Sequence, residues 1–412
     1  MSITAPATGP ALRAAVGTQP APTARIEDFL EQEQRETPFL VVDLDVVRDR
    51  YRRLDAALPT TELFYAVKAN PAPEILEFLV DEGCRFDVAS PGEIDMAIAA
   101  GAHASQLSYG NTMKKRRDIE YAIDRGVRIF SFDAMEELAK IADVVKSRSG
   151  SIDPPEVLVL CRILCDGAGA DWPLSRKFGC DVDQAVELLI KAADEGLRLG
   201  VCFHVGSQQR NPGAYRAALT TVAEQISAPL AESGHRLDAI NIGGGFPGTY
   251  LAGVPSPEDY GAAIQAAIDD LFGPEPPRLM AEPGRYLVAD AGVIQTEVVL
   301  VARKSIHDQH RWVYLDIGLF GGLAECLGEA IKYPIRTPHG AHAATGPVVI
   351  AGPTCDSADV LYEEFKYQLP LALTAGDRVE LVSTGAYTTT YSAVAFNGFP
   401  PLRAYYLPLS QP

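Results

Sequence analysis

The sequence is poor in positive charge: 36 Lys and Arg residues stand against 54 Asp and Glu residues, a formal net charge of −18. Such a surface repels phosphate backbones and anionic lipids, which argues against nucleic-acid and membrane partners. The seven cysteines include no C-x-x-C pair, so neither a disulfide framework nor a metal site such as zinc is expected. No run of 18 apolar residues occurs, and no transmembrane helix is predicted. These absences favour a protein of a reducing, cytoplasmic compartment.

The chain has 412 residues, of which 47% are hydrophobic, so we expect two domains and a large core. Residues 1–25 are rich in Ala, Pro and Thr. They lack the basic and apolar segments of a signal peptide, and we interpret them as a disordered leader.

Eight short apolar runs recur between segments of helical composition. The runs are Leu63–Val67, Arg85–Ala89, Gln106–Tyr109, Arg128–Phe132, Val157–Ile163, Gly200–Val205, Ala239–Ile242 and Arg278–Ala281. Helical segments such as Pro73–Glu82 and Pro91–Ala100 begin with Pro and are followed by Gly, as helices often are. Eight alternating units predict an α/β fold, a TIM (β/α)8 barrel over residues 44–285. An open sheet would alternate too, but no G-x-G-x-x-G motif follows the first strand.

The pattern changes after Arg285. Ile294–Val301, Trp312–Leu315, Val348–Ala351 and Arg378–Leu381 have strand composition without long helices between them. Residues 286–412 are therefore predicted to form a C-terminal antiparallel β domain, joined by an N-terminal segment at residues 26–43.

Lys68 ends the first predicted barrel strand and Asp87 the second. Catalytic groups of TIM barrels lie at these strand ends, because the loops there meet on one open face. Partial burial would lower the pKa of Lys68 and make its amine a nucleophile toward a carbonyl carbon. A lysine that extends into solvent fits the position equally well. Asp87 would pair with Lys68, with Arg162 on the fifth strand, or with both.

The later strand ends carry groups suited to a phosphate. His204 and Ser207 follow the sixth strand, where a neutral imidazole could stack on a flat cofactor or be an ordinary hydrogen-bonded core residue. Gly243-Gly244-Gly245 follow the seventh strand and leave backbone N–H groups open to an anion. Arg285, after the eighth strand, adds a bidentate fork. Phosphate sites in this fold are often built from the loops after these last two strands.

Glu282 indicates which cofactor this is, because it lies in Glu282-Pro283-Gly284-Arg285 beside the glycine loop. A carboxylate next to a pyridine nitrogen keeps that nitrogen protonated, so that the ring accepts an electron pair. A lysine, a phosphate cradle and this carboxylate together predict pyridoxal 5'-phosphate (PLP). The alternative, a Glu282–Arg285 surface pair, would not explain their place beside the glycines.

With these residues in place, the chain resembles the fold-type III PLP-dependent decarboxylases, the ornithine and diaminopimelate decarboxylase group. The resemblance extends from about Ile26 to Leu407 and rests on seven motifs in the order of the family. The motifs are Tyr65-Ala-Val-Lys-Ala-Asn70, His204-Val-Gly-Ser207, Gly243-Gly-Gly-Phe-Pro-Gly248, Glu282-Pro-Gly-Arg285, Gly352-Pro-Thr-Cys-Asp356, Gly385-Ala-Tyr387-Thr388 and Phe396-Asn-Gly-Phe399.

The resemblance implies a role for each site residue. Lys68 would bind the cofactor covalently, His204 would stack on its ring and Glu282 would bind its nitrogen. The phosphate would be held by Ser207, Gly245, Arg285 and Tyr387, and the other cofactor-binding residues would be Gly244, Pro283 and Gly284. Cys355 would return a proton to the substrate's Cα.

The resemblance also implies a homodimer with shared active sites. Cys355 and Asp356 would reach into the partner's site, and Lys177 and Asp359 would bridge the two subunits.

The predicted substrate is a small basic amino acid. Asp356 follows the cysteine directly, as in ornithine decarboxylases, and would pair with a terminal ammonium, or alternatively accept backbone N–H groups. Glu329 occupies the position of a second specificity acid, and Phe320 and Phe396 would line the pocket. Because Glu is longer than Asp, ornithine should fit better than lysine, although one methylene discriminates weakly.

The favoured reaction is therefore decarboxylation of L-ornithine to putrescine, a step of polyamine biosynthesis, with possible side activity on L-lysine. The alternatives are lysine, arginine or diaminopimelate decarboxylation, an amino-acid racemase on an alanine racemase-like barrel, and an inactive regulatory homologue.

Overall fold

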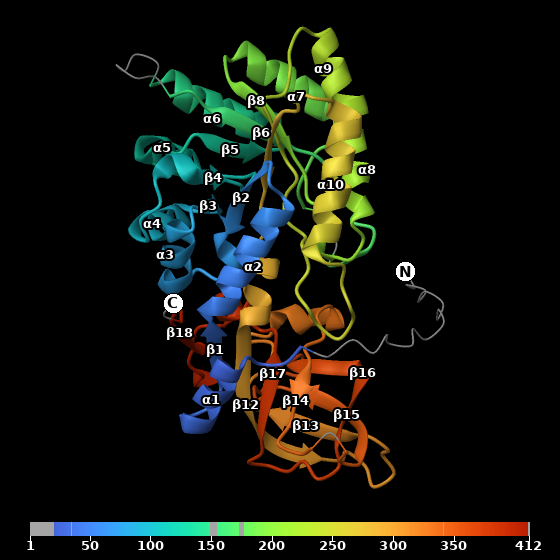
Figure 1. Cartoon of the computed structure of the whole chain (residues 1–412). Helices are drawn as coiled ribbons and strands as arrows, with labels where there is room; N and C mark the ends of the chain where they lie inside the picture. The colour runs from blue at the N-terminus through green and yellow to red at the C-terminus, as the bar shows by residue number, and fades with distance from the viewer. Residues whose placement is uncertain (1–19, 34, 149–154, 173–176, 341, 411–412) are drawn as a thin grey trace.

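The computed structural model describes residues 20–33, 35–148, 155–172, 177–340 and 342–410. A barrel with its helices forms one end of the molecule and a β domain the other (Figure 1). Residues 1–19 of the predicted leader lie outside the described residues. The last two residues of that leader are helical, because α1 (Ala24–Gln32) begins at Ala24, where the Thr23 hydroxyl caps the Ile26 N–H.

The predicted eight-stranded barrel is confirmed. All neighbouring strands are parallel, and β11 closes the ring by pairing with β2. The barrel strands are β2 (Thr61–Ala66), β3 (Arg85–Val88), β4 (Leu107–Tyr109), β5 (Ile129–Phe132), β6 (Leu158–Arg162), β8 (Arg198–Cys202), β10 (Ala239–Asn241) and β11 (Arg278–Ala281). Each overlaps one of the apolar runs of the sequence, so every polar strand end comes to the same mouth.

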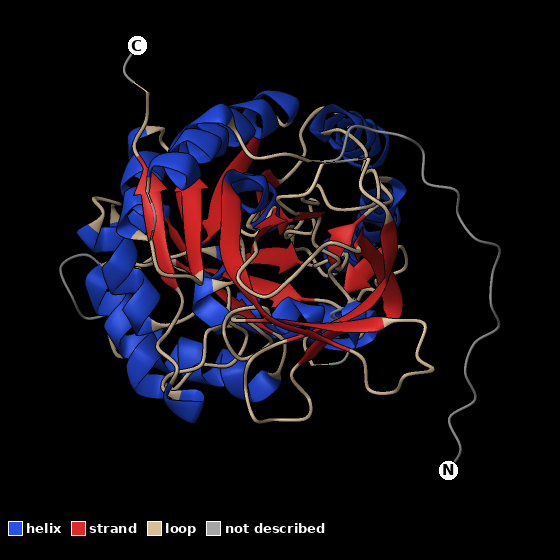
Figure 2. Cartoon of the chain, turned by 90° about the horizontal axis from the view of Figure 1, so that it is seen from below, coloured by secondary structure: helices blue, strands red, loops and turns tan. Residues whose placement is uncertain are grey.

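Helices lie along the outside of the strands (Figure 2). They are α2 (Leu44–Ala57), α3 (Pro73–Asp81), α4 (Pro91–Ala99), α5 (Arg116–Arg125), α6 (Met135–Lys146), α7 (Val182–Asp194), α8 (Gly213–Thr221), α9 (Ala228–Glu232), α10 (Pro257–Phe272) and α11 (Arg285–Val288). The start of α4 shows why they form where they do: Pro91 is its first residue, and the Ser90 side chain accepts the Glu93 N–H.

The inside of the barrel is filled with side chains below the mouth. These buried residues come from six of the eight strands: Phe64, Ile129, Leu158, Leu160, Cys202, Ala239 and Met280. Burial of a large apolar side chain stabilises the fold by roughly 1.5–3 kcal/mol. The packed interior therefore forms a rigid floor, on which the mouth residues are held.

The C-terminal β domain is a mixed sheet rather than a wholly antiparallel one. Its strands are β1 (Phe39–Asp43), β12 (Gly292–Ala302), β13 (Arg311–Leu315), β14 (Ile335–Arg336), β15 (Thr345–Ala351), β16 (Val360–Pro370), β17 (Arg378–Val382) and β18 (Arg403–Leu407). The pairs β1–β18 and β13–β15 are parallel, because chain segments return between them. The N-terminal strand β1 lies between β12 and β18.

One loop of the β domain is tied to the barrel mouth. The Asn70 side chain donates to the Gly385 carbonyl over 3.0 Å, and the Tyr387 N–H donates to the Ala69 carbonyl over 2.8 Å. The loop after β17 therefore lies against the turn that carries Lys68. Among the described residues, no helix has the length and apolar character needed to cross a membrane.

Candidate active site

Residues from both parts of the chain line one small cavity at the barrel mouth. Lys68, Ser207 and Arg285 lie on strand-end loops of the barrel, and Tyr387 comes from the β domain. The full lining is Ala66, Lys68, His204, Ser207, Gly244, Gly245, Phe246, Glu282, Gly284, Arg285 and Tyr387. The structure thus brings together most of the residues predicted to bind the cofactor, although they are spread over more than three hundred positions of sequence.

Lys68 lies in the one-turn 3-10 helix η1 (Val67–Ala69), directly after β2. Its Nζ is 3.6 Å from Asp87 Oδ2, and the side chain is 52% exposed, because it faces the open mouth. Burial lowers the pKa of Lys68, but the charges of Asp87 and Glu282 outweigh it, so the net direction is upward. The expectation of a lowered pKa is therefore wrong: the nearby negative charges favour the ammonium form of Lys68 more than burial disfavours it.

Asp87 is buried at the end of β3, and its pKa is raised by burial against the lowering effect of Lys68 and Arg162. A Cβ on Gly110 would approach Asp87 Oδ1 to 2.1 Å, so only glycine fits beside this carboxylate. The two partners considered for Asp87 therefore both act on it, Lys68 through an ion pair and Arg162 through its charge.

Glu282 follows β11 and lines the same cavity as Lys68. Burial and the charge of Asp87 raise its pKa to about 7. The Asn241 side-chain amide donates to Glu282 Oε1 over 2.5 Å and fixes the carboxylate. Sequence reasoning missed Asn241, although a polar residue inside the apolar strand Ala-Ile-Asn was a signal.

His204 is a neutral ring. Burial, together with the charges of Arg162 and Lys68, holds its pKa well below the ordinary value. Its Nδ1 accepts the Gly206 N–H over 3.0 Å, so the ring proton of the neutral form is on Nε2. A neutral imidazole of fixed orientation is what stacking on a flat ring requires.

Two glycines of the loop after β10 stand where no side chain fits. Gly245 has a φ of +105°, and a Cβ there would lie 2.6 Å from the Gly206 carbonyl oxygen. A Cβ on Gly244 would lie 2.6 Å from the Glu282 carbonyl oxygen. Neither glycine can carry a side chain without moving the backbone, and both line the Lys68 cavity, where their N–H groups fit the binding of a phosphate.

Arg285 is buried and carries the most polar contacts of the site. Its Nη2 donates to Ser207 Oγ over 3.1 Å and its Nη1 to the Tyr250 hydroxyl over 2.9 Å. Both nitrogens also bind the carboxylate of Glu325, over 2.6 and 2.5 Å. Sequence reasoning expected an acid in this segment but placed it at Glu329, and it missed Glu325 and Tyr250.

Cys355 and Asp356 do not line the Lys68 cavity. Both are exposed on the loop between β15 and β16, where the Cys355 N–H donates to Asn397 Oδ1 and Asp356 Oδ1 accepts the Ala358 N–H. One carboxylate oxygen of Asp356 thus accepts a backbone N–H, as the structural alternative for this residue predicted.

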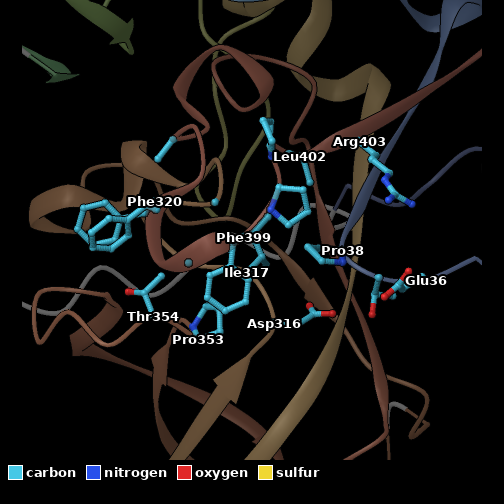
Figure 3. Close-up of a pocket in the computed structure, with 17 residues that line it drawn as sticks. Glu36, Pro38, Asp316, Ile317, Phe320, Pro353, Thr354, Phe399, Leu402 and Arg403 are labelled. Atoms are coloured by element: carbon cyan, nitrogen blue, oxygen red, sulfur yellow. The ribbon is translucent and has the colours of Figure 1, made fainter.

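A second cavity, of about 220 Å³, lies beside this loop and includes Thr354 (Figure 3). The predicted substrate residues Phe320 and Phe396 both line it, with ring centroids 4.8 Å apart. Phe399 and Pro353 add further apolar surface.

Three predicted residues are engaged elsewhere in the chain. The Glu329 carboxylate accepts backbone N–H groups of residues 363, 364 and 365, so this conformation does not turn it toward the Lys68 cavity. Asp359 is not a surface acid: it is 3% exposed and accepts N–H groups of Leu319 and Thr354. The predicted bridge from Asp359 to another subunit stays a prediction. Lys177 is exposed, with its Nζ over the Phe178 ring.

A TIM barrel with a lysine, a buried carboxylate, a glycine loop and an arginine at its mouth defines the class of PLP-dependent enzymes. Residues 44–289 match the family described as "Pyridoxal-dependent decarboxylase, pyridoxal binding domain". The chain belongs to this family and is a PLP-dependent amino-acid decarboxylase.

Individual relatives agree over nearly the whole chain. A lysine/ornithine decarboxylase of Selenomonas ruminantium is 38% identical over 88% of each chain, and an ornithine decarboxylase of Caenorhabditis elegans is 34% identical over 89% of this chain and 86% of its own. The crystal structure of lysine/ornithine decarboxylase from Vibrio vulnificus, complexed with cadaverine, superimposes with a TM-score of 0.81. It is 33% identical and covers 94% of this chain and 100% of its own.

Proposed function

We propose that this enzyme decarboxylates L-ornithine to putrescine and carbon dioxide, with L-lysine as a slower second substrate. The observation that carries the proposal is the exposed acid Asp356, directly after Cys355. It belongs to the loop whose Thr354 lines the apolar cavity of Phe320 and Phe396. A carboxylate there suits a substrate that ends in an ammonium group, and the cavity suits its methylenes. Relatives named as lysine/ornithine and ornithine decarboxylases support the same substrate class.

The residues of the barrel mouth divide the binding of the cofactor among them. Ser207, Arg285 and the N–H groups of Gly244 and Gly245 would hold the phosphate. Glu282, fixed by Asn241, would lie against the ring nitrogen. When bound, PLP accepts the electron pair left at Cα as carbon dioxide departs.

Lys68 and Cys355 would handle the protons. In this structure Lys68 Nζ is paired with Asp87, which keeps the amine at the mouth of the barrel. Cys355 Sγ would hold the proton that returns to Cα, because its loop carries the thiol on an exposed surface.

The complete site requires a second copy of the chain. Cys355 and Asp356 are exposed on the β domain, whereas Lys68, Glu282 and Arg285 share the barrel cavity. A homodimer that places the Cys355 loop of one subunit at the barrel mouth of the other would unite both sets. Its symmetry would produce two identical sites.

The test is carbon dioxide release from L-ornithine, L-lysine, L-arginine and meso-diaminopimelate, measured as kcat/KM. We expect ornithine to rank first and lysine second. Asp356→Asn should lower kcat/KM for ornithine at least a hundredfold, because an unpaired substrate ammonium costs several kcal/mol, and the PLP content should not change. Asp308→Asn, a change in an exposed turn of the same domain, is the control. A higher kcat/KM for arginine or diaminopimelate, or an active Asp356→Asn variant, would refute the proposal.

A further inference from the structure

The guanidinium of Arg285 has almost no donor left for a ligand. Its two Nη atoms carry four hydrogens, and four acceptor atoms take them: Tyr250 Oη, Ser207 Oγ and the two oxygens of Glu325. The remaining donor, Nε, is buried and has no partner among the described residues. A phosphate that binds Arg285 is therefore limited to Nε or must displace one of these acceptors.

Glu325 is the only charged member of this set of acceptors. Its side chain is 7% exposed and that of Arg285 is 4% exposed, so water screens their interaction weakly. The carboxylate neutralises the guanidinium next to a cradle that binds a phosphate dianion. Like charges in a buried site repel each other strongly, so Glu325 opposes the phosphate directly.

We infer that Glu325 is a positioning residue that competes with the phosphate of PLP for Arg285 and thereby sets how tightly the cofactor is held. The inference rests on the family's use of PLP, and it is independent of which amino acid the enzyme decarboxylates. It assigns most of the phosphate's binding energy to the backbone N–H groups of the glycine loop. Arg285 contributes less than an unpaired arginine would.

Glu325 belongs to a short segment that also contacts the sheet of the β domain. Glu325 lies in the 3-10 segment η5 (Ala324–Glu329), which ends at Glu329. The Glu329 carboxylate in turn accepts the backbone N–H groups of residues 363–365, which lie within β16. The segment that contacts Arg285 through Glu325 is thus also held against β16 through Glu329.

The experiment is equilibrium binding of PLP and of pyridoxal, which lacks the phosphate, to the full-length protein at fixed pH and ionic strength. Imine absorbance reports both ligands, and inorganic phosphate serves as a competitor. Glu325→Gln keeps the shape of the side chain and removes its charge, so we expect the Kd for PLP to fall about tenfold. The Kd for pyridoxal should change less than about twofold, because that ligand carries no dianion.

Glu62→Gln is the matched control. Glu62 forms the same two-bonded fork with Arg278, over 2.7 and 2.6 Å, but at the opposite end of the barrel strands. This variant should leave the Kd of both ligands unchanged. Tyr250→Phe gives a second measurement, since it frees one Nη1 hydrogen without altering charge and should tighten PLP binding about twofold to threefold.

Three results would overturn the inference. The first is a folded Glu325→Gln variant that binds PLP with unaltered or weaker affinity. The second is an equal change for PLP and pyridoxal, which would place the effect at the ring and not at the phosphate. If Glu325→Gln does not fold, a Tyr250→Phe variant with unchanged or weaker PLP binding contradicts the competition. A wild-type protein that takes up no PLP would instead contradict the assignment of the cofactor.

Discussion

At the scale of single residues, charge and burial decide what each acid at the barrel mouth can do. Glu282 and Asp87 both lie where burial disfavours a negative charge, and Lys68 is the cation that offsets them. Because the charges of Lys68, Asp87 and Glu282 act on one another, the protonation of each depends on that of the others. The pKa of Glu282 is therefore about 7, so that its carboxyl group can exchange a proton with a ligand near neutral pH.

A first prediction concerns the pH dependence of stability. The pKa of Glu282 is about 7, above its ordinary value of 4.5, so the folded protein binds this proton more tightly than the unfolded chain. Its burial therefore destabilises the cofactor-free protein as pH rises from about 4.5 to about 7. Glu282→Gln should gain about 2 kcal/mol over wild type between pH 5 and pH 8, measured by urea unfolding at fixed protein concentration.

A difference between the two proteins that stays constant over this pH range would contradict the raised pKa. Glu62→Gln serves as the control, because Glu62 is paired with arginines at the other end of the barrel and should show no such trend.

Residues that belong to sequence motifs could be assigned to the site from the sequence. Residues that reach the site only through tertiary contacts could not. Lys68, Glu282 and Arg285 end strands of regular spacing, so the fold alone brings them together. Glu325 could not be found in this way, because it is one of two acids in a glycine-rich segment without periodicity. Only the path of the chain around Arg285 shows that Glu325 is the one that turns inward.

At the scale of elements, the loop after β10 is where the backbone itself forms the site. Gly245 has a φ of +105°, and a Cβ there would meet a backbone oxygen that cannot move aside. Gly253 follows on the same connection toward α10, but a Cβ there would meet nothing within 4 Å. Gly253 has neither the positive φ of Gly245 nor its close contact.

A second prediction follows from this pair. Gly245→Ala should lower the free energy of unfolding by about 1–3 kcal/mol and raise the Kd for PLP at least tenfold, because the strained loop withdraws from the phosphate. Gly253→Ala should leave both quantities unchanged. Thermal unfolding and PLP titration check the pair, and a Gly245→Ala variant with wild-type PLP affinity would exclude a direct role for the loop.

The barrel elements were predictable and those of the β domain only in part. Short apolar runs mark the barrel strands, and apolar residues repeating about every 3.6 positions mark the helices between them. In the β domain, β16 (Val360–Pro370) was not predicted, because charged residues interrupt its apolar pattern. The parallel pairs β1–β18 and β13–β15 join segments that are distant in sequence, and no local signal encodes such pairing.

At the scale of the whole molecule, the proposed active site is divided between two chains. Lys68 and Cys355 lie in separate regions of one chain, the first in the barrel cavity and the second on an exposed loop of the β domain. A protein built in this way should be active only as an assembly.

A third prediction tests that division. Lys68→Ala and Cys355→Ala should each be nearly inactive as homodimers. After co-refolding in equal amounts, the mixture should recover about a quarter of wild-type activity, because half of the dimers are mixed and each of these has one intact site. Decarboxylation assays of the mixture and of each variant alone check this. If the mixture is no more active than its components, each site is formed within a single chain.

The most direct test of the account is the chemical identification of the lysine that holds the cofactor. The holoenzyme is reduced with borohydride and digested, and the modified peptide is located by mass spectrometry. We predict that the pyridoxyl group is on Lys68. Lys114 is the natural alternative, since it is buried and its pKa is lowered by burial to about 8, but its Nζ already donates to the carbonyls of Asn111 and Ser131. A label on Lys114, or an unmodified Lys68, would contradict the central claim.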